Sequence, residues 1–587
     1  MKNKVEVERF PHIQLNLYLE TAETTSISTD NELILKKKSG SYYTKPEIVS
    51  LILDLAGYTI DKPLYEMSLL EPSTGQGAFL IPAIERLLES VAKVFGAQVF
   101  ADDGKSYDLL HNAIRSIEVS MDKYDDLFNT VTSILLRRGL SKQLSQRLLG
   151  IWLVQTDFLF WNQQVEQCFD FIVGNPPYIR IENIEEKVAK KYRSTYKTLF
   201  DRADIYIAFI EHSLEMLNKN GRLSFICTDR FTKNRYGKEI RRLVSEKYHV
   251  MHFLDIHNSQ PFIDEVSAYP CIFTFCNASR GDSRTLRMDE VSTEHLQLAR
   301  NYLIDGQYIE SDLLEMHTIK DWFHGTDPWV LNGKLAQMLL KKVEANHPLI
   351  SEPPHNINIG IGVATGATAV YVIKPENVDI EPEVLLPTVT KDDITKGYIA
   401  WGGHYVINPY NDDGSLVDLE KFPKLKAYFI RHEQLLKSRS TARNNPSKWY
   451  KTIDRIFPER LKEPKLLIPD IKLKNLIVLD EGNYYPEHSL YYITAGTWDI
   501  KALQALLVSS IIKFFIWSYA TKMRGDYLRY QAQYLRKIRL PVGVTKEDCE
   551  ELKRMYELGD YDAIDRIVSE LYNLSADELQ TIQELVQ

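Results

Sequence analysis

Four consecutive residues in the first third of the chain carry the clearest chemistry. Asn175, Pro176, Pro177 and Tyr178 follow a strand-length apolar segment, 169–173. Two successive prolines stiffen the backbone, so the side-chain oxygen of Asn175 and the carbonyl of Pro176 can each accept a hydrogen bond from one amino group. Drawing both protons aside favours a tetrahedral nitrogen with a lone pair aimed at an electrophile. Tyr178 supplies a ring for stacking on an aromatic amine.

A glycine-containing turn lies about one hundred residues upstream, directly after an apolar segment. Its sequence is Glu71-Pro72-Ser73-Thr74-Gly75-Gln76-Gly77, and a helical pattern follows it. Glycines at a strand-to-helix junction let the backbone approach a ligand closely. The full dinucleotide fingerprint and the Gly-Lys-Ser/Thr phosphate loop are both missing, so the turn does not favour a nucleoside triphosphate.

Two acidic residues close the strands that follow this turn. Glu118 ends the segment Ile117-Glu118-Val119, and Asp157-Phe158 ends the next one. A carboxylate at the position of Glu118 is well placed to accept hydrogen bonds from a ribose diol. Asp157 can accept from an adenine amino group, with the ring of Phe158 as a stacking face. Together they suit an adenosine-containing cofactor, although each acid alone would more often be a solvated strand end.

A helix start is expected just before the turn. Thr44 and Glu47 have the spacing of a capping box, and helical periodicity continues through Leu55. The free amides of a helix N-terminus favour an anion such as a carboxylate. By itself, this signature is more often a cap without a ligand.

The elements that must position these residues alternate regularly. Strand-length apolar segments at 67–70, 114–119, 169–173 and 223–227 are separated by segments with helical periodicity. This alternation predicts an α/β fold with a doubly wound, mostly parallel sheet, whose ligand sites lie beyond the carboxyl ends of the strands. From about residue 330 the pattern becomes irregular and rich in turns, which predicts a mixed α+β domain.

We therefore expect four parts in the chain. Residues 1–292 form the catalytic domain, 293–346 a helical connector, 347–544 a second domain, and 545–587 an acidic tail with the periodicity of two amphipathic helices.

Charge is distributed unevenly along the 587 residues. The net charge is −9, but the tail 546–587 has 12 acidic and 4 basic residues and so carries −8 of it. Residues 431–465 have 10 basic and 4 acidic residues, and 521–539 have 6 and 1. Such stretches, interleaved with aromatic residues, predict a phosphate-binding groove, with Arg439 and Arg443 as candidate contacts. A solvated charged face is the alternative.

The five cysteines are scattered and form no close pairs, which predicts neither a metal site nor a disulfide framework. The start of the chain lacks a secretory signal, and the apolar stretch 503–517 is too short and too interrupted to span a membrane. We expect a cytoplasmic protein without a membrane partner.

The motifs together resemble those of the N6-adenine DNA methyltransferases with gamma-type motif order and a TaqI-like C-terminal target-recognition domain. The resemblance rests on Tyr42-Tyr43-Thr44, Glu71 to Gly77, Glu118, Asp157-Phe158, Asn175 to Tyr178, 202–209 and 221–226, and in the later half on 362–366, 482–485 and 529–535.

The resemblance implies a class I S-adenosylmethionine-dependent methyltransferase fold and methylation of a flipped adenine in double-stranded DNA. It implies S-adenosyl-L-methionine as cofactor, and a separately encoded restriction endonuclease as companion. It also implies roles for particular residues. Asn175, Pro176 and Tyr178 would act in catalysis, and Phe262 would be a second wall for the target base. The cofactor would contact Thr44, Glu71, Ser73, Gly75, Glu118, Asp157, Phe158 and Pro177.

Three alternatives remain open. Enzymes that methylate a protein glutamine or an RNA base also use an Asn-Pro-Pro-Tyr motif, but the large second domain favours DNA. A fused endonuclease is the second alternative, since Pro469-Asp470 with Asp499-Ile500-Lys501 nominally fits a nuclease pattern. The third is a DNA-binding protein without catalytic activity.

Overall fold

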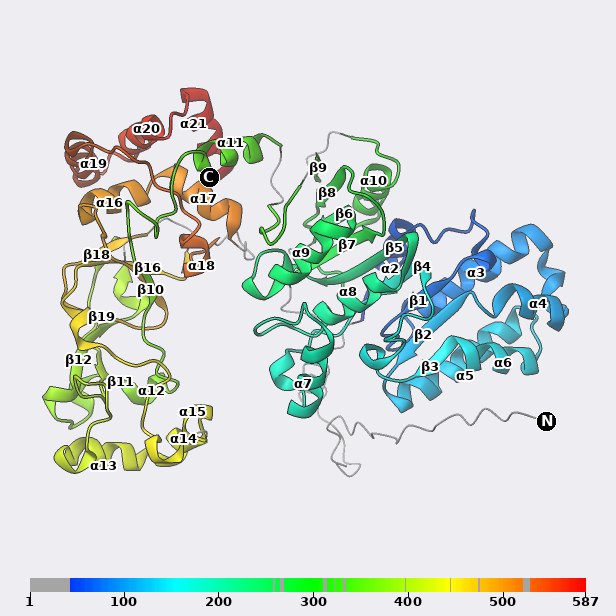
Figure 1. Ribbon diagram of the computed structural model, residues 1–587, viewed down its shortest axis with the longest axis horizontal. Helices are drawn as coiled ribbons and strands as arrows, with labels where there is room; N and C mark the ends of the chain where they lie inside the picture. Colours follow the sequence, from blue (N-terminus) through cyan, green and yellow to red (C-terminus); the bar gives the residue numbers. More distant parts are fainter. Residues whose placement is uncertain are drawn as a thin grey trace.

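The computed structural model describes residues 43–586, apart from 257–258, 264–268, 310–313, 321, 331–333, 396, 444, 473–475 and 521–527. Within this part of the chain, an α/β region is followed by an elongated C-terminal region that lies beside it (Figure 1).

A nine-stranded sheet organises the first region, in the order β3-β2-β1-β4-β5-β7-β6-β8-β9. Strands β1 to β5 are mutually parallel, and β7 runs antiparallel between β5 and β6. The prediction of a doubly wound, mostly parallel sheet is confirmed. The strands are β1 (Leu69–Glu71), β2 (Ile114–Glu118), β3 (Leu153–Gln155), β4 (Phe169–Gly174), β5 (Leu217–Thr228), β6 (His249–Asp255), β7 (Pro270–Cys276), β8 (Ser283–Arg287) and β9 (Glu315–Ile319).

Helices cover both faces of this sheet because its strands are apolar on both sides. Along β4, Phe171 and Val173 face one core whereas Ile172 faces the other. Helix α2 packs on β4 and β5 on the first face, and α8 packs on β5 on the second. The helices are α2 (Pro46–Ala56), α3 (Leu80–Phe95), α4 (Asp103–Leu110), α5 (Met121–Arg137), α6 (Lys142–Trp152), α7 (Glu186–Thr195), α8 (Tyr206–Glu215), α9 (Lys238–Lys247) and α10 (Thr293–Leu303).

Residues 293–346, expected as a connector, are divided between the two regions. Helix α10 packs on α2 and β8, and β9 is the edge strand of the large sheet. Trp322 and Trp329 belong to the core on its second face. Helix α11 (Lys334–Glu344) instead joins the C-terminal core. The segment therefore extends both cores instead of forming a body of its own.

The C-terminal region contains several small sheets. One has the order β10-β20-β16-β18 and another β11-β15-β12-β19, and two pairs, β13-β14 and β17-β21, complete them. The strands are β10 (Ile359–Ile361), β11 (Val372–Ile373), β12 (Leu385–Val389), β13 (Ile394–Thr395), β14 (Tyr398–Ile399), β15 (Tyr405–Ile407), β16 (Lys465–Pro469), β17 (Ile471–Lys472), β18 (Val478–Asp480), β19 (Tyr485–Pro486), β20 (Leu490–Ile493) and β21 (Leu528–Arg529).

Helices gather at the two ends of this elongated region (Figure 1). The acidic tail forms three helices, where two were expected, and they pack with α11, α16 and α17 in one core. The tail is thus part of the C-terminal region. Besides α11, the described helices of the C-terminal region are α12 (Thr368–Tyr371), α13 (Pro423–Arg431), α14 (Glu433–Ser438), α15 (Ser440–Arg443), α16 (Ile500–Leu507), α17 (Ser510–Tyr519), α18 (Ala532–Leu535) and the three tail helices α19 (Lys546–Leu558), α20 (Tyr561–Leu571) and α21 (Ala576–Val586).

The two regions touch through the segment that follows β5. The ammonium group of Lys233 donates to the carbonyl of Ala520 at 2.8 Å, and the Tyr534 hydroxyl donates to the side chain of Asn234 at 3.5 Å. None of the described helices is by itself long and apolar enough to cross a membrane; α16 and α17, joined at a sharp bend, reach that length and composition only as a pair.

Candidate active site

The carboxyl ends of β1 and β2 bring two carboxylates together. Glu71 is 1% exposed and accepts a hydrogen bond from the Ser116 hydroxyl at 3.1 Å. Burial raises the pKa of Glu71 well above its ordinary value, the Ser116 bond opposes this shift, and the charge of Glu118 adds to it. The second oxygen of Glu71, Oε1, accepts no hydrogen bond of ordinary geometry from the described residues, although the backbone of Phe79 and Leu80 lies near enough to lower the pKa of this carboxyl. A buried acceptor left in this way is suited to meet a donor from a ligand.

The glycine turn closes over Glu118. The Gly75 amide donates to Glu118 Oε2 at 2.8 Å, and the Ser120 amide donates to Oε1 at 2.8 Å. Gly75 has φ +60°, and a Cβ built there would meet no atom within 4 Å. The turn therefore leaves open space on its outer side. Gly77, at φ +84°, is needed for close packing instead, because a Cβ would lie 2.6 Å from Leu127.

The Asn-Pro-Pro-Tyr segment leaves β4 beside this turn. The Ser73 hydroxyl donates to the main-chain carbonyl of Asn175 at 3.0 Å. The side-chain nitrogen of Asn175, Nδ2, donates to the Thr44 hydroxyl at 3.3 Å. In this orientation the side-chain oxygen Oδ1 points away from Thr44. The Tyr178 hydroxyl donates to the carbonyl of Ile226 on β5 at 3.2 Å, which fixes its ring. Three predicted residues, Thr44, Ser73 and Asn175, are thus joined by hydrogen bonds.

Helix α2 starts where a helix was expected, but without the predicted capping box. Its N-cap is Lys45, no side chain caps it, and Pro46 is its first residue. Thr44 is 4% exposed and instead forms an antiparallel bridge with Phe262. The Lys45 amide donates to Pro261 at 2.9 Å, and the Ile263 amide donates to Tyr43 at 2.9 Å. The bridge explains how Phe262 reaches the site from far along the chain.

Two aromatic rings meet at this point. The centroids of Tyr178 and Phe262 lie 6.5 Å apart, with an interplanar angle of 71°. Phe262 is 2% exposed, whereas Tyr178 is half-buried. The two rings therefore meet at a steep angle in an edge-to-face contact, with Phe262 buried and Tyr178 the more exposed of the two.

The third acidic residue, Asp157, already accepts hydrogen bonds from the protein, which the sequence did not predict. Asp157 Oδ1 accepts from the Leu159 amide at 2.9 Å, and Oδ2 accepts from the Tyr192 hydroxyl on α7 at 2.5 Å. Burial raises the pKa of Asp157, and the bond from Tyr192 opposes this shift. Sequence reasoning missed Tyr192, because one tyrosine on a short helix carries no motif.

The ring of Phe158 is not an open stacking face. It is 2% exposed and packs against Phe209 and His212, with centroids 5.0 and 4.8 Å away. The expected face is thus used by the core on the second side of the sheet. Pro177, also expected to contact the cofactor, is half-buried, and Pro176, expected to act in catalysis, is buried.

The basic stretch 431–465 proves to be partly structural. The Arg439 guanidinium donates to the carbonyls of Leu436, Thr365, Trp449 and Lys451 at 2.8–3.0 Å. These bonds use four of its five N–H groups, so Arg439 serves mainly to join backbone segments, and its expected role as a phosphate contact is not supported. Arg443, by contrast, is exposed. Residues 521–527 of the second basic stretch lie outside the described residues.

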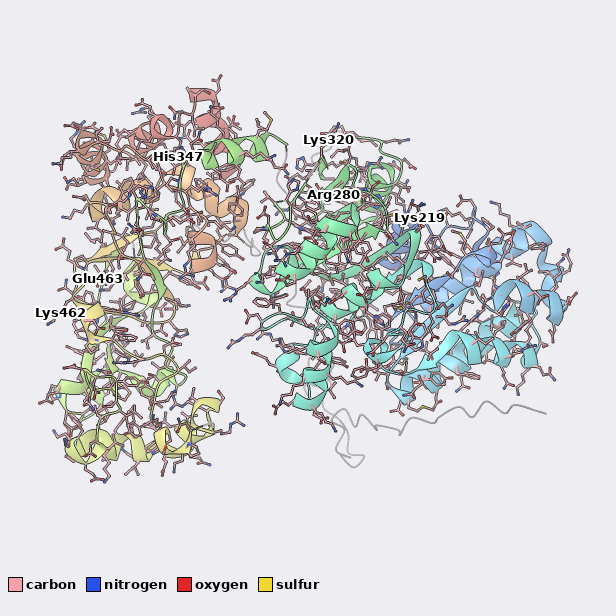
Figure 2. All side chains as sticks on the ribbon, viewed as in Figure 1. Lys219, Arg280, Lys320, His347, Lys462 and Glu463 are labelled. Carbon is pink, nitrogen blue, oxygen red and sulfur yellow. The ribbon has the colours of Figure 1, made fainter. Side chains whose placement is uncertain are left out.

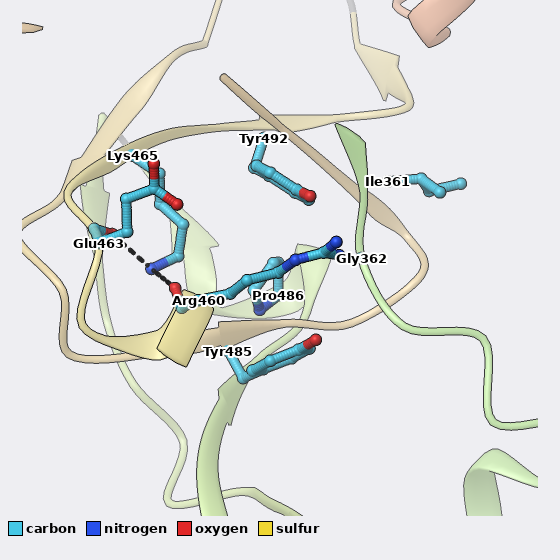
Figure 3. A pocket seen from close by; sticks show the side chains of 8 residues that line it. All are labelled: Ile361, Gly362, Arg460, Glu463, Lys465, Tyr485, Pro486 and Tyr492. Atoms are coloured by element: carbon cyan, nitrogen blue, oxygen red, sulfur yellow. Dashed lines mark hydrogen bonds between the residues drawn. The ribbon is translucent and has the colours of Figure 1, made fainter. Parts of the chain in front are cut away.

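Lys465 also turns inward, beside a small pocket (Figure 3). Its ammonium group lies 2.8 Å from Asp480 Oδ2, with both side chains at most 2% exposed. It donates to three carbonyls of residues 460–463 as well. Arg460 extends between Tyr485 and Tyr492 in the same pocket (Figure 3). These cations hold loops together.

The nominal nuclease pattern does not converge on one site. Asp470 pairs with Arg529, whereas Asp499 caps α16 by accepting from the Lys501 and Ala502 amides. The part of the chain that the structure describes contains no group of three or more histidine, cysteine or acidic side chains arranged to hold a metal ion.

Other basic side chains lie at the opposite edge of the large sheet. Lys219 is near the start of β5, and Arg280 and Lys320 follow strands β7 and β9, each antiparallel to its neighbour (Figure 2). They are therefore at the amino-terminal edge of the parallel strands, away from Asn175 and Glu118.

Two family models match the chain, each over one region. The model described as Eco57I restriction-modification methylase matches residues 15–262, and the TaqI-like C-terminal specificity domain matches residues 392–542.

Individual relatives match over nearly the full length. The type II methyltransferase M.BstVI of Geobacillus stearothermophilus is 46% identical, covering 93% of this chain and 98% of the relative. M.PaeR7I of Pseudomonas aeruginosa is 40% identical, covering 95% of each. Among solved structures, the type IIL restriction-modification enzyme MmeI in complex with DNA aligns with a TM-score of 0.59 at 14% identity, covering 95% of this chain and 78% of that one. At this identity, the structural match shows a shared fold.

Proposed function

The chain belongs to the type II methyltransferases of restriction-modification systems, with an Eco57I-type methylase region and a TaqI-like specificity domain, and on that premise we propose that it methylates N6 of adenine in duplex DNA. The methyl donor would be S-adenosylmethionine. The observation that carries the proposal is the fixed Asn175, held between Ser73 and Thr44 beside the Tyr178 ring.

The residues present fit this donor. Among the described residues, none donates a hydrogen bond of ordinary geometry to the buried Glu71 Oε1, and a Cβ at Gly75 would meet none of their atoms within 4 Å. Each oxygen of Glu118 accepts one backbone amide and keeps a second lone pair, which suits the two hydroxyls of a ribose. When bound, the donor supplies an electrophilic methyl group on a sulfonium.

The chain's own residues act on the target amine. Asn175 Oδ1 and the Pro176 carbonyl accept its two protons in hydrogen bonds, so the nitrogen lone pair is directed at the methyl group without a strong base. Tyr178, fixed through Ile226, stacks on the base. The amine of a base within the duplex cannot be reached, so the adenine must leave the stack.

The C-terminal region would read the DNA sequence, as the name of its matching family model indicates. MmeI, which shares the fold, was solved in complex with DNA. We further propose that methylation protects DNA from a separately encoded endonuclease, since M.BstVI and M.PaeR7I, which match over nearly the full length, are named as methyltransferases.

Long-read sequencing tests the proposal directly. Genomic DNA is incubated with the protein and S-adenosylmethionine, and modified bases are mapped, with Asn175→Ala as the matched control. We expect N6-methyladenine at one recurring sequence, and none with the variant. Methylation of cytosine, or of RNA or a protein glutamine in parallel assays but not of DNA adenine, would contradict it.

A further inference from the structure

We propose that Tyr192 is a positioning residue that keeps the Asp157 carboxylate a pure hydrogen-bond acceptor, and so makes the cofactor site selective for a purine with a 6-amino group. This inference rests on the proposed function, because it concerns how an adenosine cofactor is held.

The geometry is that of a strong, shielded hydrogen bond. The Tyr192 hydroxyl donates to Asp157 Oδ2 at 2.5 Å, and Tyr192 is only 6% exposed. Hydroxyl donors to ionised carboxylates are short and about twice as strong as neutral pairs. The Leu159 amide occupies one position on Oδ1. Both fixed partners are donors, so any further partner that reaches the ionised Asp157 carboxylate must donate a hydrogen bond to it as well.

An acceptor at this position discriminates between purines. A 6-amino group donates to an ionised carboxylate, whereas a 6-oxo group presents a second acceptor and is repelled. If Asp157 were protonated, its O–H would donate to a 6-oxo group and the selectivity would fall. Leaving a buried polar group unpaired is what makes such discrimination large.

Tyr192 favours the ionised form of Asp157 against the effect of burial. Burial raises the Asp157 pKa, and the hydrogen bond from Tyr192 lowers it, with a smaller contribution from Lys191. Tyr196 also faces Asp157, and His212 packs on Phe158 and Tyr196. The His212 pKa is lowered by burial, so its ring stays neutral at neutral pH.

Removing the Tyr192 hydroxyl should therefore raise the Asp157 pKa further. As the pH falls, the Asp157 carboxylate of the variant would become protonated at a higher pH than that of the wild type. Binding of an amino-purine cofactor should weaken first on the acidic side and recover on the alkaline side.

Tyr196, the residue directly after helix α7, provides a matched control. The Tyr196 hydroxyl donates to the carbonyl of Leu159 at 2.5 Å, in the same turn, and Tyr196 is 3% exposed. Both tyrosines thus fasten one turn through equally short bonds, but only Tyr192 meets a charged acceptor. Tyr196→Phe removes the hydrogen bond to Leu159 but no hydrogen bond to Asp157, so it tests whether loosening the turn is enough to produce the effect.

The experiment is calorimetric titration of the full chain with S-adenosylhomocysteine and S-inosylhomocysteine, from mildly acidic to mildly alkaline pH. For Tyr192→Phe we expect adenosyl binding to weaken by about tenfold on the acidic side, with recovery at alkaline pH. The ratio of adenosyl to inosyl affinity should fall as well. Tyr196→Phe should leave both the pH profile and the ratio as in the wild type.

The ratio is measured within one variant, so a loss of folded protein cancels from it. Equal changes in Tyr192→Phe and Tyr196→Phe at every pH, or an unchanged ratio in Tyr192→Phe, would overturn the inference. If the wild type binds neither compound, the proposed function itself fails, and the inference fails with it.

Discussion

At the edge of the large sheet, polar side chains at or just after the ends of β1, β2 and β4 lie close together, Gly75 is unobstructed, and Glu71 Oε1 accepts no hydrogen bond from the described residues. In the C-terminal region, the side chains of Arg439 and Lys465 donate hydrogen bonds to backbone carbonyls of neighbouring loops. The parallel sheet exposes polar groups at one edge because its strands end together there. A region of small sheets and long loops must use such groups to hold the loops in place. Similar polar residues thus gather at one edge of the sheet in the first region and bind backbone carbonyls in the other.

The largest expected effect is at the edge of the sheet. Asn175→Ala should abolish methyl transfer, a loss of about 10³-fold or more, because a preorganised polar group is removed from the reacting amine. Cofactor binding should be largely intact, as measured by calorimetry beside a methylation assay. Turnover close to that of the wild type would show that this edge does not carry the chemistry.

In the C-terminal region, the matching change should damage the fold instead. Lys465→Met leaves Asp480 charged and buried, at a cost of about 3–5 kcal/mol in the free energy of unfolding. Hydrogen exchange at Gly482, Asn483 and Tyr484, whose amides donate to Asp480, would report it. The exposed Lys462 is the control, since Lys462→Met should change stability by less than about 0.5 kcal/mol. Equal effects of the two variants would remove this contrast.

The aromatic wall is expected to contribute less. A target adenine replaced by 2-aminopurine should emit more strongly when bound, and more strongly still with Tyr178→Ala, which removes stacking worth about 1–3 kcal/mol. A mismatch opposite the target should also tighten binding. Emission at the duplex level in both proteins, together with unchanged mismatch affinity, would rule out extrusion into this pocket.

The smallest expected effect is a difference in DNA affinity and stability between variants of Arg439 and Arg443. Arg443→Ala should weaken binding to all DNA sequences and reduce the salt dependence by about one slope unit. Arg439→Ala should leave that slope unchanged and lower stability by about 1–3 kcal/mol, because buried carbonyls lose their donor. Binding at several salt concentrations and thermal unfolding measure the two quantities. A slope change with Arg439→Ala alone would reverse the assignment.

The sequence was most informative where residues follow strands. Glu71, Glu118 and Asn175 were found because parallel strands bring their carboxyl ends to one edge. Phe262 was placed through the family resemblance, and its bridge to Thr44 had no local signal. Tyr192 was missed, because a single tyrosine on a short helix carries no motif and fits ordinary packing equally well.

Other expectations depended on information that a sequence pattern does not contain. Local charge indicates basic residues, but not whether backbone carbonyls already occupy their donors, as they do for Arg439. The Phe158 ring was expected to stack on a ligand, but the opposite face of the sheet uses it. The connector 293–346 looked separate because its helical periodicity is continuous, whereas its packing partners are long-range.

The bridge between Thr44 and Phe262 has a consequence for the order in which the first region folds during translation. On the ribosome, Thr44 and Asn175 emerge long before Phe262, and β7, which lies between β5 and β6, emerges later still. A nascent chain that stops before residue 262 carries the Asn-Pro-Pro-Tyr segment without the wall that faces it. The bridge between Thr44 and Phe262 therefore forms only late in the synthesis of the first region, shortly before β7 completes the middle of the large sheet.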